Sequence, residues 1–150
     1  RLAAQLDDSI DAWHRQRREA CASGIGLATN LEIDELGILR ATRVAMQRAL
    51  LELGVEPGHL LIDALLLREC DANQTALIRG DSLSLSIAAA SVLAKTARDK
   101  IMTAADGLYP GYGFSSHKGY GTTCHRQALL EKGPCDLHRR TFRPVMECQG

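Results

Sequence analysis

Two short apolar segments that each end in an aspartate constrain the fold of this chain more than any other feature. The first, HLLID, runs from His59 to Asp63, and the second, TALIRGD, runs from Thr75 to Asp81. Helical patterns precede and follow them, and apolar runs that alternate with helices are typical of parallel strands in an α/β fold. In such sheets ligands gather at the carboxyl ends of the strands. We therefore expect Asp63 and Asp81 to lie at the same edge of the sheet.

The segment after the second aspartate, from Ser86 to Met102, predicts a helix that packs on this sheet. Its small and apolar residues recur at helical spacing, at Ile87, Ala90, Leu93, Ala94, Ala97 and Ile101. Beside that stripe, Ser91, Lys95 and Arg98 form a polar and basic line. Such a line can face an anion, and Lys95 is a candidate for a phosphate contact.

Local signals predict the structure of the first third of the chain. Apolar residues at helical spacing indicate a helix from Leu2 to Ala20, with Trp13 as a core residue. The segment from Ala22 to Thr29 resembles a strand that is weakened by Gly24 and Gly26.

Capping and breaking residues set the limits of the other helices. Thr29 followed by Glu32 matches a capping box, which predicts a helix start, and Gly37 is expected to break that helix. Two further helices are predicted over Ile38–Leu53 and His125–Lys132. Gly54 follows the first of these and is expected to end it.

The segment from Leu108 to Thr123, LYPGYGFSSHKGYGTT, is rich in glycine and aromatic residues and is predicted to be irregular. Loops of this length in a compact domain are usually functional. With His117 and Lys118 among its aromatic residues, the loop could supply base stacking and phosphate contacts. The alternative is a rigid loop that its aromatic residues anchor to the protein body, and we expect that role for Phe114.

The paired aspartates favour a metal site. Two carboxylates at one sheet edge repel each other unless a cation or a proton lies between them. Oxygen ligands of this kind suit Mg²⁺ or Mn²⁺, which keep open positions for water and phosphate oxygens. Taken singly, Asp63 or Asp81 is explained as well by a capping role. Asp99, at the other end of the same predicted helix segment, remains an alternative to Asp81.

Composition limits the remaining possibilities. The 150 residues suit one domain, and a net charge of zero does not by itself indicate a nucleic-acid partner. Residues 111–150, however, hold six Lys or Arg and three His against three acids, which could follow phosphates. No apolar run approaches the length of a membrane span, so we expect a cytoplasmic protein that has no membrane partner and is a monomer.

The five cysteines are odd in number and include no CxxC pair, so reduced thiols are expected. The set Cys124, His125, Cys135 and His138 could be imagined as zinc ligands. Its spacing fits no common structural zinc site, and we do not favour it.

Five sequence blocks, in this order, resemble the ribonuclease HII family. They are EIDELGILRATRVAM (Glu32–Met46), LLID (Leu60–Asp63), GD followed by SIAAASVLAKTARD (Gly80–Asp99), YPGYGFSSHKGYGT (Tyr109–Thr122) and HRRTFRPV (His138–Val145). Together they span residues 32–145.

The resemblance implies a ribonuclease H-like α/β fold, a mixed sheet flanked by helices, with a site of four carboxylates. Asp63 and Asp81 match two of these, and Tyr120 matches the residue that contacts the ribose 2′-hydroxyl. The family's other two carboxylates belong to a strand upstream of the present sequence. We therefore expect residues 1–150 to be a single catalytic domain that is incomplete at its N-terminus and lacks the N-terminal strands. Ala64 stands where the family usually has glycine.

The activity implied is a metal-dependent endonuclease, a ribonuclease H that acts in DNA replication and repair. It would hydrolyse the RNA strand of RNA/DNA hybrids and cut on the 5′ side of ribonucleotides embedded in DNA, leaving 5′-phosphate and 3′-hydroxyl ends. Mg²⁺ or Mn²⁺ would be bound by Asp63 and Asp81, with Tyr120, Lys118, His117 and Lys95 as substrate-binding residues. We expect the 150-residue chain alone to be inactive.

Two alternatives come from other classes of protein. One is a module that binds RNA/DNA hybrids without cutting them. The other is a signalling receiver domain in which Asp63 accepts a phosphoryl group beside Lys95, although this leaves the glycine-rich and aromatic loop unexplained.

Overall fold

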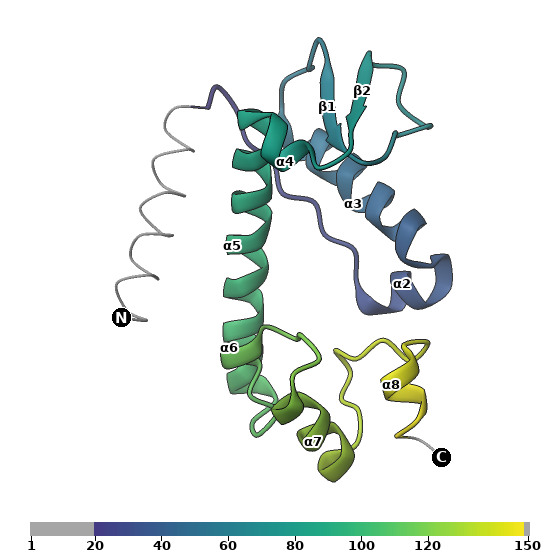
Figure 1. Ribbon diagram of the computed structural model, residues 1–150, viewed down its shortest axis with the longest axis vertical. Helices are drawn as coiled ribbons and strands as arrows, with labels where there is room; N and C mark the ends of the chain where they lie inside the picture. The colour runs from purple at the N-terminus through teal and green to yellow at the C-terminus, as the bar shows by residue number, and fades with distance from the viewer. Residues whose placement is uncertain (1–19, 149–150) are drawn as a thin grey trace. The chain divides into compact units, whose positions relative to one another are not determined.

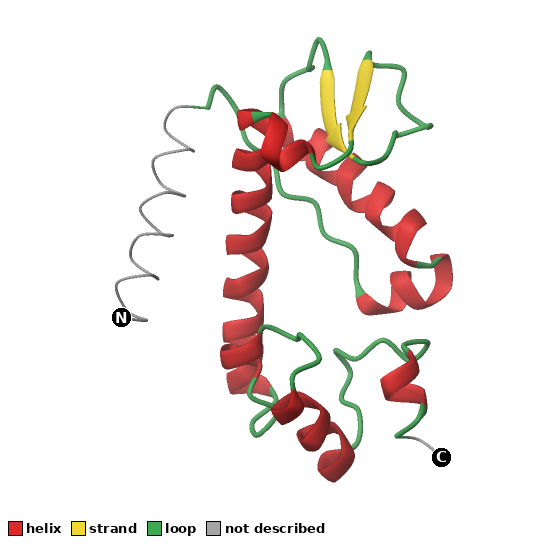
Figure 2. Cartoon of the chain, in the orientation of Figure 1, coloured by secondary structure: helices red, strands yellow, loops and turns green. Residues whose placement is uncertain are grey.

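The structure is a computed structural model that describes residues 20–148, and these are mainly helical with one small sheet (Figures 1 and 2). Its elements are α2 (Asn30–Leu36), α3 (Ile38–Leu53), β1 (Leu60–Asp63), β2 (Gln74–Leu77), α4 (Gly80–Leu83), α5 (Leu85–Leu108), α6 (Phe114–His117), α7 (Thr123–Lys132) and α8 (Arg143–Met146). The predicted helix over Leu2–Ala20, with Trp13, lies outside the described residues except for its last position.

The described chain forms two compact units. Unit 1 comprises residues 20–27 and 43–96, and unit 2 comprises residues 28–42 and 97–148. The divisions fall within α3 and within α5. Across residues 20–148, no helix combines the length and the apolar character that crossing a membrane requires.

The two aspartate-ended segments form the sheet of unit 1, as predicted. Strands β1 and β2 run parallel as neighbours, with Leu60 opposite Gln74 and Asp63 opposite Leu77 (Figure 2). Burial alternates along β1, and its inward side chains pack against Leu67. The cluster also contacts Met46, Leu50, Leu65, Cys70 and Ala72. An α/β unit with a parallel sheet is therefore confirmed.

One side chain fixes the connection between the strands. Gln74 accepts a hydrogen bond from the Leu67 amide through Oε1 (2.8 Å) and donates through Nε2 to the carbonyl oxygens of Leu67 and Cys70, both at 2.8 Å. These bonds satisfy backbone groups that a short crossover without a helix would otherwise leave unpaired.

The strand predicted over residues 22–29 is wrong, because this segment is irregular and lies against α3. A Cβ at Gly26 would lie 1.8 Å from the carbonyl oxygen of Ala45, so the two backbones touch where only glycine fits. The amide of Ile25 donates to Oε2 of Glu52 at 2.8 Å. A side chain of α3 therefore accepts the hydrogen bond from a backbone amide that a neighbouring strand would otherwise accept.

The predicted helix limits near the start of the described chain are confirmed. Thr29 and Glu32 form a complete capping box at α2. Gly37 ends that helix with φ +77°, and Gly54 follows α3 with φ +69°. Both glycines adopt the left-handed conformation that residues with a Cβ adopt only under strain.

Helix α5 is longer than predicted and packs less of its small-residue stripe than expected. Ile87 is buried, whereas Ala90, Ala94 and Ile101 are exposed. The reason is length: a four-residue strand spans about 13 Å, whereas a helix of 24 residues spans about 36 Å. This sheet can therefore cover only the first turns of α5.

The core of unit 2 is built around the glycine-rich loop. Tyr112 and Phe114 are buried with Ala105 of α5 and Ala128 of α7. Phe114, 2% exposed, anchors the loop as expected. The loop was predicted to be irregular, but it contains the one-turn helix α6, because Gly113 at φ +76° allows the chain to turn into it.

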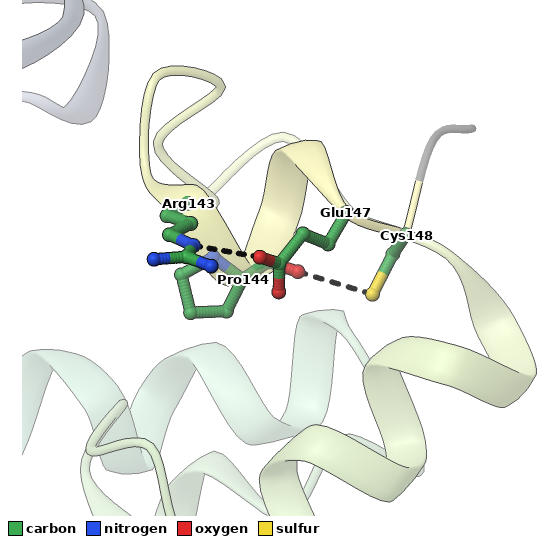
Figure 3. Close-up of polar contacts among 4 residues, drawn as sticks. All are labelled: Arg143, Pro144, Glu147 and Cys148. Atoms are coloured by element: carbon green, nitrogen blue, oxygen red, sulfur yellow. Dashed lines mark hydrogen bonds and ion pairs between the residues drawn. The ribbon is translucent and has the colours of Figure 1, made fainter.

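Helix α7 begins after Thr122, whose side chain caps the His125 amide, and ends at Gly133 as its sequence predicts. The last element, α8, is one turn long. Within it Arg143 Nε donates to Glu147 Oε1 at 2.7 Å, and Cys148 Sγ donates to the Pro144 carbonyl oxygen (Figure 3). Both ionic side chains are largely exposed, so this pair adds little to stability.

Candidate functional site

One hydrogen bond brings the two aspartate-bearing segments together. Asp63 is the last residue of β1 and is exposed, and its Oδ1 accepts a hydrogen bond from the Gly80 amide at 2.9 Å. Asp81 directly follows Gly80 in the first turn of α4 and is also exposed. The carboxylate of Asp63 therefore lies beside the start of the turn that carries Asp81, within unit 1.

Gly80 permits this close approach. A Cβ at this position would lie 2.6 Å from Cδ1 of Ile87, 3.3 Å from Cβ of Leu77 and 3.5 Å from Oδ1 of Asp63. Residue 80 is buried, so a side chain there would have to displace the sheet, α5 or the carboxylate.

Left-handed residues follow both strands. Ala64, with φ +62°, comes directly after Asp63, and its amide donates to the Leu77 carbonyl oxygen at 3.0 Å. Arg79, with φ +56°, directly precedes α4. Ala64 therefore forms a turn that glycine would form with less strain.

The donor set at this edge suits a magnesium-type ion. It consists of two exposed carboxylates, and residues 20–148 contain no group of three or more His, Cys, Asp or Glu side chains that could hold a metal ion. Mg²⁺ is commonly bound through one or two carboxylates, with water and phosphate oxygens completing its coordination. Structural zinc usually needs four protein ligands.

Tyr120 lies in unit 2, where its backbone is hydrogen-bonded and its side chain is exposed. Its amide donates to the His117 carbonyl oxygen at 2.9 Å, and its own carbonyl oxygen accepts from the Thr122 amide at 2.8 Å. The guanidinium carbon of Arg98 lies 4.8 Å from the ring centroid, and Arg98 also donates to the Lys118 carbonyl oxygen. The side chain of Tyr120 is 51% exposed.

The other predicted substrate-binding residues differ in exposure. His117 is 8% exposed, its Nε2 donates to the Tyr112 carbonyl oxygen at 2.8 Å, and its Nδ1 accepts from the Gly119 amide. A phosphate contact would require this ring to leave its partners. Lys118 is half-buried, and its Nζ donates to Oγ1 of Thr103 at 2.7 Å. Lys95 is exposed on α5, in the part that belongs to unit 1.

Three of the four residues considered as zinc ligands lie together in unit 2, but His125 and Cys135 contact opposite sides of the His138 ring. His138 Nε2 lies 3.1 Å from His125 Nε2, whereas Cys135 Sγ lies 3.1 Å from His138 Nδ1. Cys124 is exposed. The ligand atoms of Cys135 and His125 therefore do not converge on one point.

Asp34 has a structural role that the sequence did not reveal. Its carboxylate accepts hydrogen bonds from the Arg140 amide (2.6 Å) and from the amide (3.0 Å) and hydroxyl (2.5 Å) of Thr141. Burial raises the pKa of Asp34, but the bonds from Thr141 and Arg140 and the charge of Arg139 outweigh it and leave the pKa lowered. The basic HRRT segment is thereby held on α2. More than 100 residues separate the partners, so no local pattern predicts the contact.

Comparison with known proteins assigns the chain to a family. A sequence model described as ribonuclease HII matches residues 3–145. The chain belongs to the ribonuclease HII family. The ribonuclease HII of Myxococcus xanthus is 49% identical to it over 154 residues, and that of Chloroflexus aurantiacus is 54% identical over 154 residues. The ribonuclease HII of Syntrophotalea carbinolica is 52% identical over 147 residues.

These matches cover nearly all of this chain but only part of its ribonuclease HII relatives. They include 97%, 97% and 98% of the present sequence, and 53%, 73% and 69% of the three relatives in the same order. The chain thus spans about half the length of the Myxococcus protein. The ribonuclease HII family implies a ribonuclease H-like α/β fold, and the parallel pair β1–β2 with its helices agrees with part of such a fold.

Proposed function

We propose that the protein containing this chain is a metal-dependent endonuclease. It hydrolyses the RNA strand of RNA/DNA hybrids and cuts duplex DNA on the 5′ side of an embedded ribonucleotide, leaving 5′-phosphate and 3′-hydroxyl ends. The observation that carries the proposal is the hydrogen bond from the Gly80 amide to Asp63, which puts the exposed Asp63 carboxylate beside the backbone that leads into exposed Asp81.

In this proposal Asp63 and Asp81 hold Mg²⁺ or Mn²⁺ by their carboxylate oxygens. Ions held there would supply the chemistry of water activation and of charge stabilisation at the leaving 3′-oxygen. The Gly80 amide orients Asp63 by occupying its Oδ1. A mixed sheet flanked by helices would complete the fold in the whole protein.

The substrate contacts come from the loop of unit 2 and from α5. The exposed side chain of Tyr120 contacts the ribose 2′-hydroxyl, the group that distinguishes RNA from DNA. Lys95 and Lys118 provide positive charge for backbone phosphates. His117 supports the loop that carries Lys118 and Tyr120, and it reaches a phosphate only if its ring leaves the Tyr112 carbonyl oxygen.

The decisive experiment is cleavage by the full-length protein of a duplex with one embedded ribonucleotide, in Mg²⁺ and in Mn²⁺. Asp81→Asn should lower cleavage by more than about a hundredfold, because loss of a mere partner of a metal ligand already costs 10–100-fold. Asp71→Asn is the matched control, since Asp71 is exposed in the connection that precedes β2. Full cleavage activity in Asp81→Asn together with loss of cleavage in Asp99→Asn would show that Asp99, and not Asp81, is the metal ligand.

A hybrid-binding module without catalysis is the second candidate. It is favoured by the presence of only two carboxylates at the proposed metal edge, with no larger ligand group among the described residues. Binding to RNA/DNA duplex that weakens with salt, without cleavage in either metal, would support it over the endonuclease.

A further inference from the structure

Two histidines of unit 2 lie in a single hydrogen-bonded line that ends on Tyr120. The Cys135 amide donates to His138 Nδ1 at 3.0 Å. His138 Nε2 lies 3.1 Å from His125 Nε2, and His125 Nδ1 lies 3.0 Å from the Tyr120 carbonyl oxygen. The line runs from the segment after α7, through α7 itself, to the loop.

The Tyr120 end of this line fixes the proton positions. A backbone carbonyl can only accept, so a neutral His125 must carry its proton on Nδ1 and accept at Nε2. His138 must then donate through Nε2 and accept through Nδ1. At Nδ1 the Cys135 amide at 3.0 Å satisfies this requirement, whereas the Cys135 carbonyl oxygen at 3.3 Å would need a proton there and is left without that bond.

The surroundings bury the His138 end of this line, whereas His125 is partly buried and its bond to exposed Tyr120 lies nearer the surface. His138 is 7% exposed, and the Phe114 ring packs at 5.5 Å from the His125 ring and 5.7 Å from the His138 ring. The His117 ring stacks on His125 with centroids 4.3 Å apart. In such a setting an alternative proton position would leave a buried group without a partner, which is costly.

Burial lowers the pKa of both histidines. For His125 the charge of His117 acts in the same direction, while the bond to the Tyr120 carbonyl oxygen opposes it. For His138 the charges of His125 and Arg140 add to the effect of burial, while the hydrogen bond at the Cys135 backbone opposes it. Both rings are therefore held neutral, as the hydrogen bonds require.

We propose that His138 and His125 form a positioning relay, in which His125 Nδ1–H holds the backbone of Tyr120 and His138 holds His125 in the donating tautomer. The proposal rests on the proposed function, because its consequence is the placement of the Tyr120 phenol at the ribose. These are positioning residues, since neither reaches the substrate and both act through Tyr120. The Thr122 amide shares the same carbonyl oxygen, so the relay completes the two bonds that this oxygen can accept.

Two substitutions of one residue test the relay in the full-length protein. In His125→Asn the side-chain amide nitrogen falls near the place of Nδ1 and can still donate to Tyr120. In His125→Gln the polar atoms fall near Nε2, so the bond to His138 is kept and the bond to Tyr120 is lost. On a duplex with one embedded ribonucleotide, we expect His125→Gln to lower kcat about tenfold, the factor of one lost hydrogen bond, with little change in KM.

His125→Asn should remain closer to wild type, which a merely space-filling role would not predict. His59→Gln is the matched control, because His59 is exposed in unit 1, where it bonds to Thr75 Oγ1. A wild-type kcat in His125→Gln, or a lower kcat in His125→Asn than in His125→Gln, would overturn the proposal.

A measurement that needs no activity separates the relay from the function. Nitrogen-15 NMR of the wild-type imidazoles should show His125 protonated on Nδ1 and His138 on Nε2 at neutral pH. The opposite tautomer at His125 would overturn the relay even in a fully active enzyme. The expected tautomers in a protein that cleaves no ribonucleotide duplex would instead reject the proposed function and the substrate role of the relay.

Discussion

The edge that carries the carboxylates and the loop that carries Tyr120 are built in opposite ways. At the edge, Asp63 and Asp81 are exposed; the Gly80 amide donates to Asp63 at 2.9 Å, and the Ser82 hydroxyl donates to Asp81 Oδ1 at 3.5 Å. The loop is held by contacts among its own side chains instead, and Phe114 and His117 are buried inside it. One region is open to ligands and the other is fixed by its own residues.

This difference follows from the task proposed for each region. Carboxylates that bind Mg²⁺ must keep oxygens available, and the ion and its substrate complete their geometry. A side chain that distinguishes ribose from deoxyribose gains by being placed before the substrate arrives, because less ordering is then required on binding. We therefore expect substitutions in the loop to cost stability, and substitutions at the edge to affect metal-dependent cleavage more.

The largest loss of stability is expected from Phe114→Ala in the full-length protein. Its ring contacts Tyr112 and three histidines and is nearly inaccessible, so its removal should cost about 3–5 kcal/mol in the free energy of unfolding. The other phenylalanine, Phe142, is 44% exposed, and Phe142→Ala should cost about 1 kcal/mol or less. Denaturant unfolding measures both, and equal costs would show that the loop is not the fixed region.

Gly80→Ala should cost about 1–3 kcal/mol, because the added methyl group meets Ile87, Leu77 and the Asp63 carboxylate. Cleavage should fall further than this loss of stability explains, since the methyl group disturbs the position of Asp63. Gly107→Ala is the control, because a Cβ added at Gly107 would meet open space and alanine is the better helix residue there. If Gly80→Ala kept full activity, the hydrogen bond to Asp63 would not be what positions the carboxylate.

Acid should weaken unit 2 through its histidines. The pKa values of His125 and His138 are lowered from 6.5 by burial, so below that pH the unfolded chain binds protons that the folded chain does not. Stability is then complete above pH 6.5 and falls as the pH drops towards the folded pKa. The groups that face the pair are His117, Cys135 and Arg140.

Thermal unfolding between pH 8 and pH 5 tests this expectation. That range lies above the usual carboxyl pKa of 3.8, and the pKa of Asp34 is lower still, so Asp34 stays ionised throughout. His125→Asn should flatten the fall in melting temperature. An unchanged slope in that variant would mean that the acid sensitivity comes from elsewhere.

The smallest effect is expected at the carboxylate edge, from Ala64→Gly. The left-handed conformation at φ +62° costs an L-residue about 1–2 kcal/mol, which glycine would avoid. Glycine also gives the unfolded chain more conformational freedom, and this lowers the free energy of unfolding by about 0.4–1 kcal/mol. A net stabilisation of up to about 1 kcal/mol should appear as a higher melting temperature. Ala104→Gly, near the C-terminal end of α5, should act in the opposite direction by up to about 0.5–1 kcal/mol.

Sequence patterns predicted the features that depend on near neighbours. The capping box at Thr29, the glycine ends at Gly37 and Gly54, and the parallel pair of strands are all confirmed. Each follows from interactions within a few residues or from apolar runs that must be buried together. The roles of Asp63, Asp81, Tyr120, Lys118, His117 and Lys95 stay predictions, and the structure adds where each of these residues lies.

The misjudged elements all depended on what their residues would meet in space. The segment with Gly24 and Gly26 has the composition of a weak strand, yet close contact between its backbone and α3 excludes it from the sheet. The alanine stripe of α5 indicated packing that a sheet of two short strands is too small to provide. Strand pairing and helix coverage are decided by the partner, which a local pattern does not contain.

The sequence by itself determined that this chain pairs two aspartate-ended strands with a small-residue helix, and that its ordered motifs are those of the ribonuclease HII family. Only the tertiary structure decided that the Gly80 amide holds Asp63, that Asp34 anchors the HRRT segment, and that two neutral histidines end on the Tyr120 carbonyl oxygen. The physical reason is the same in each case. A hydrogen bond depends on angles and distances between groups that are far apart in the chain, and folding alone sets these.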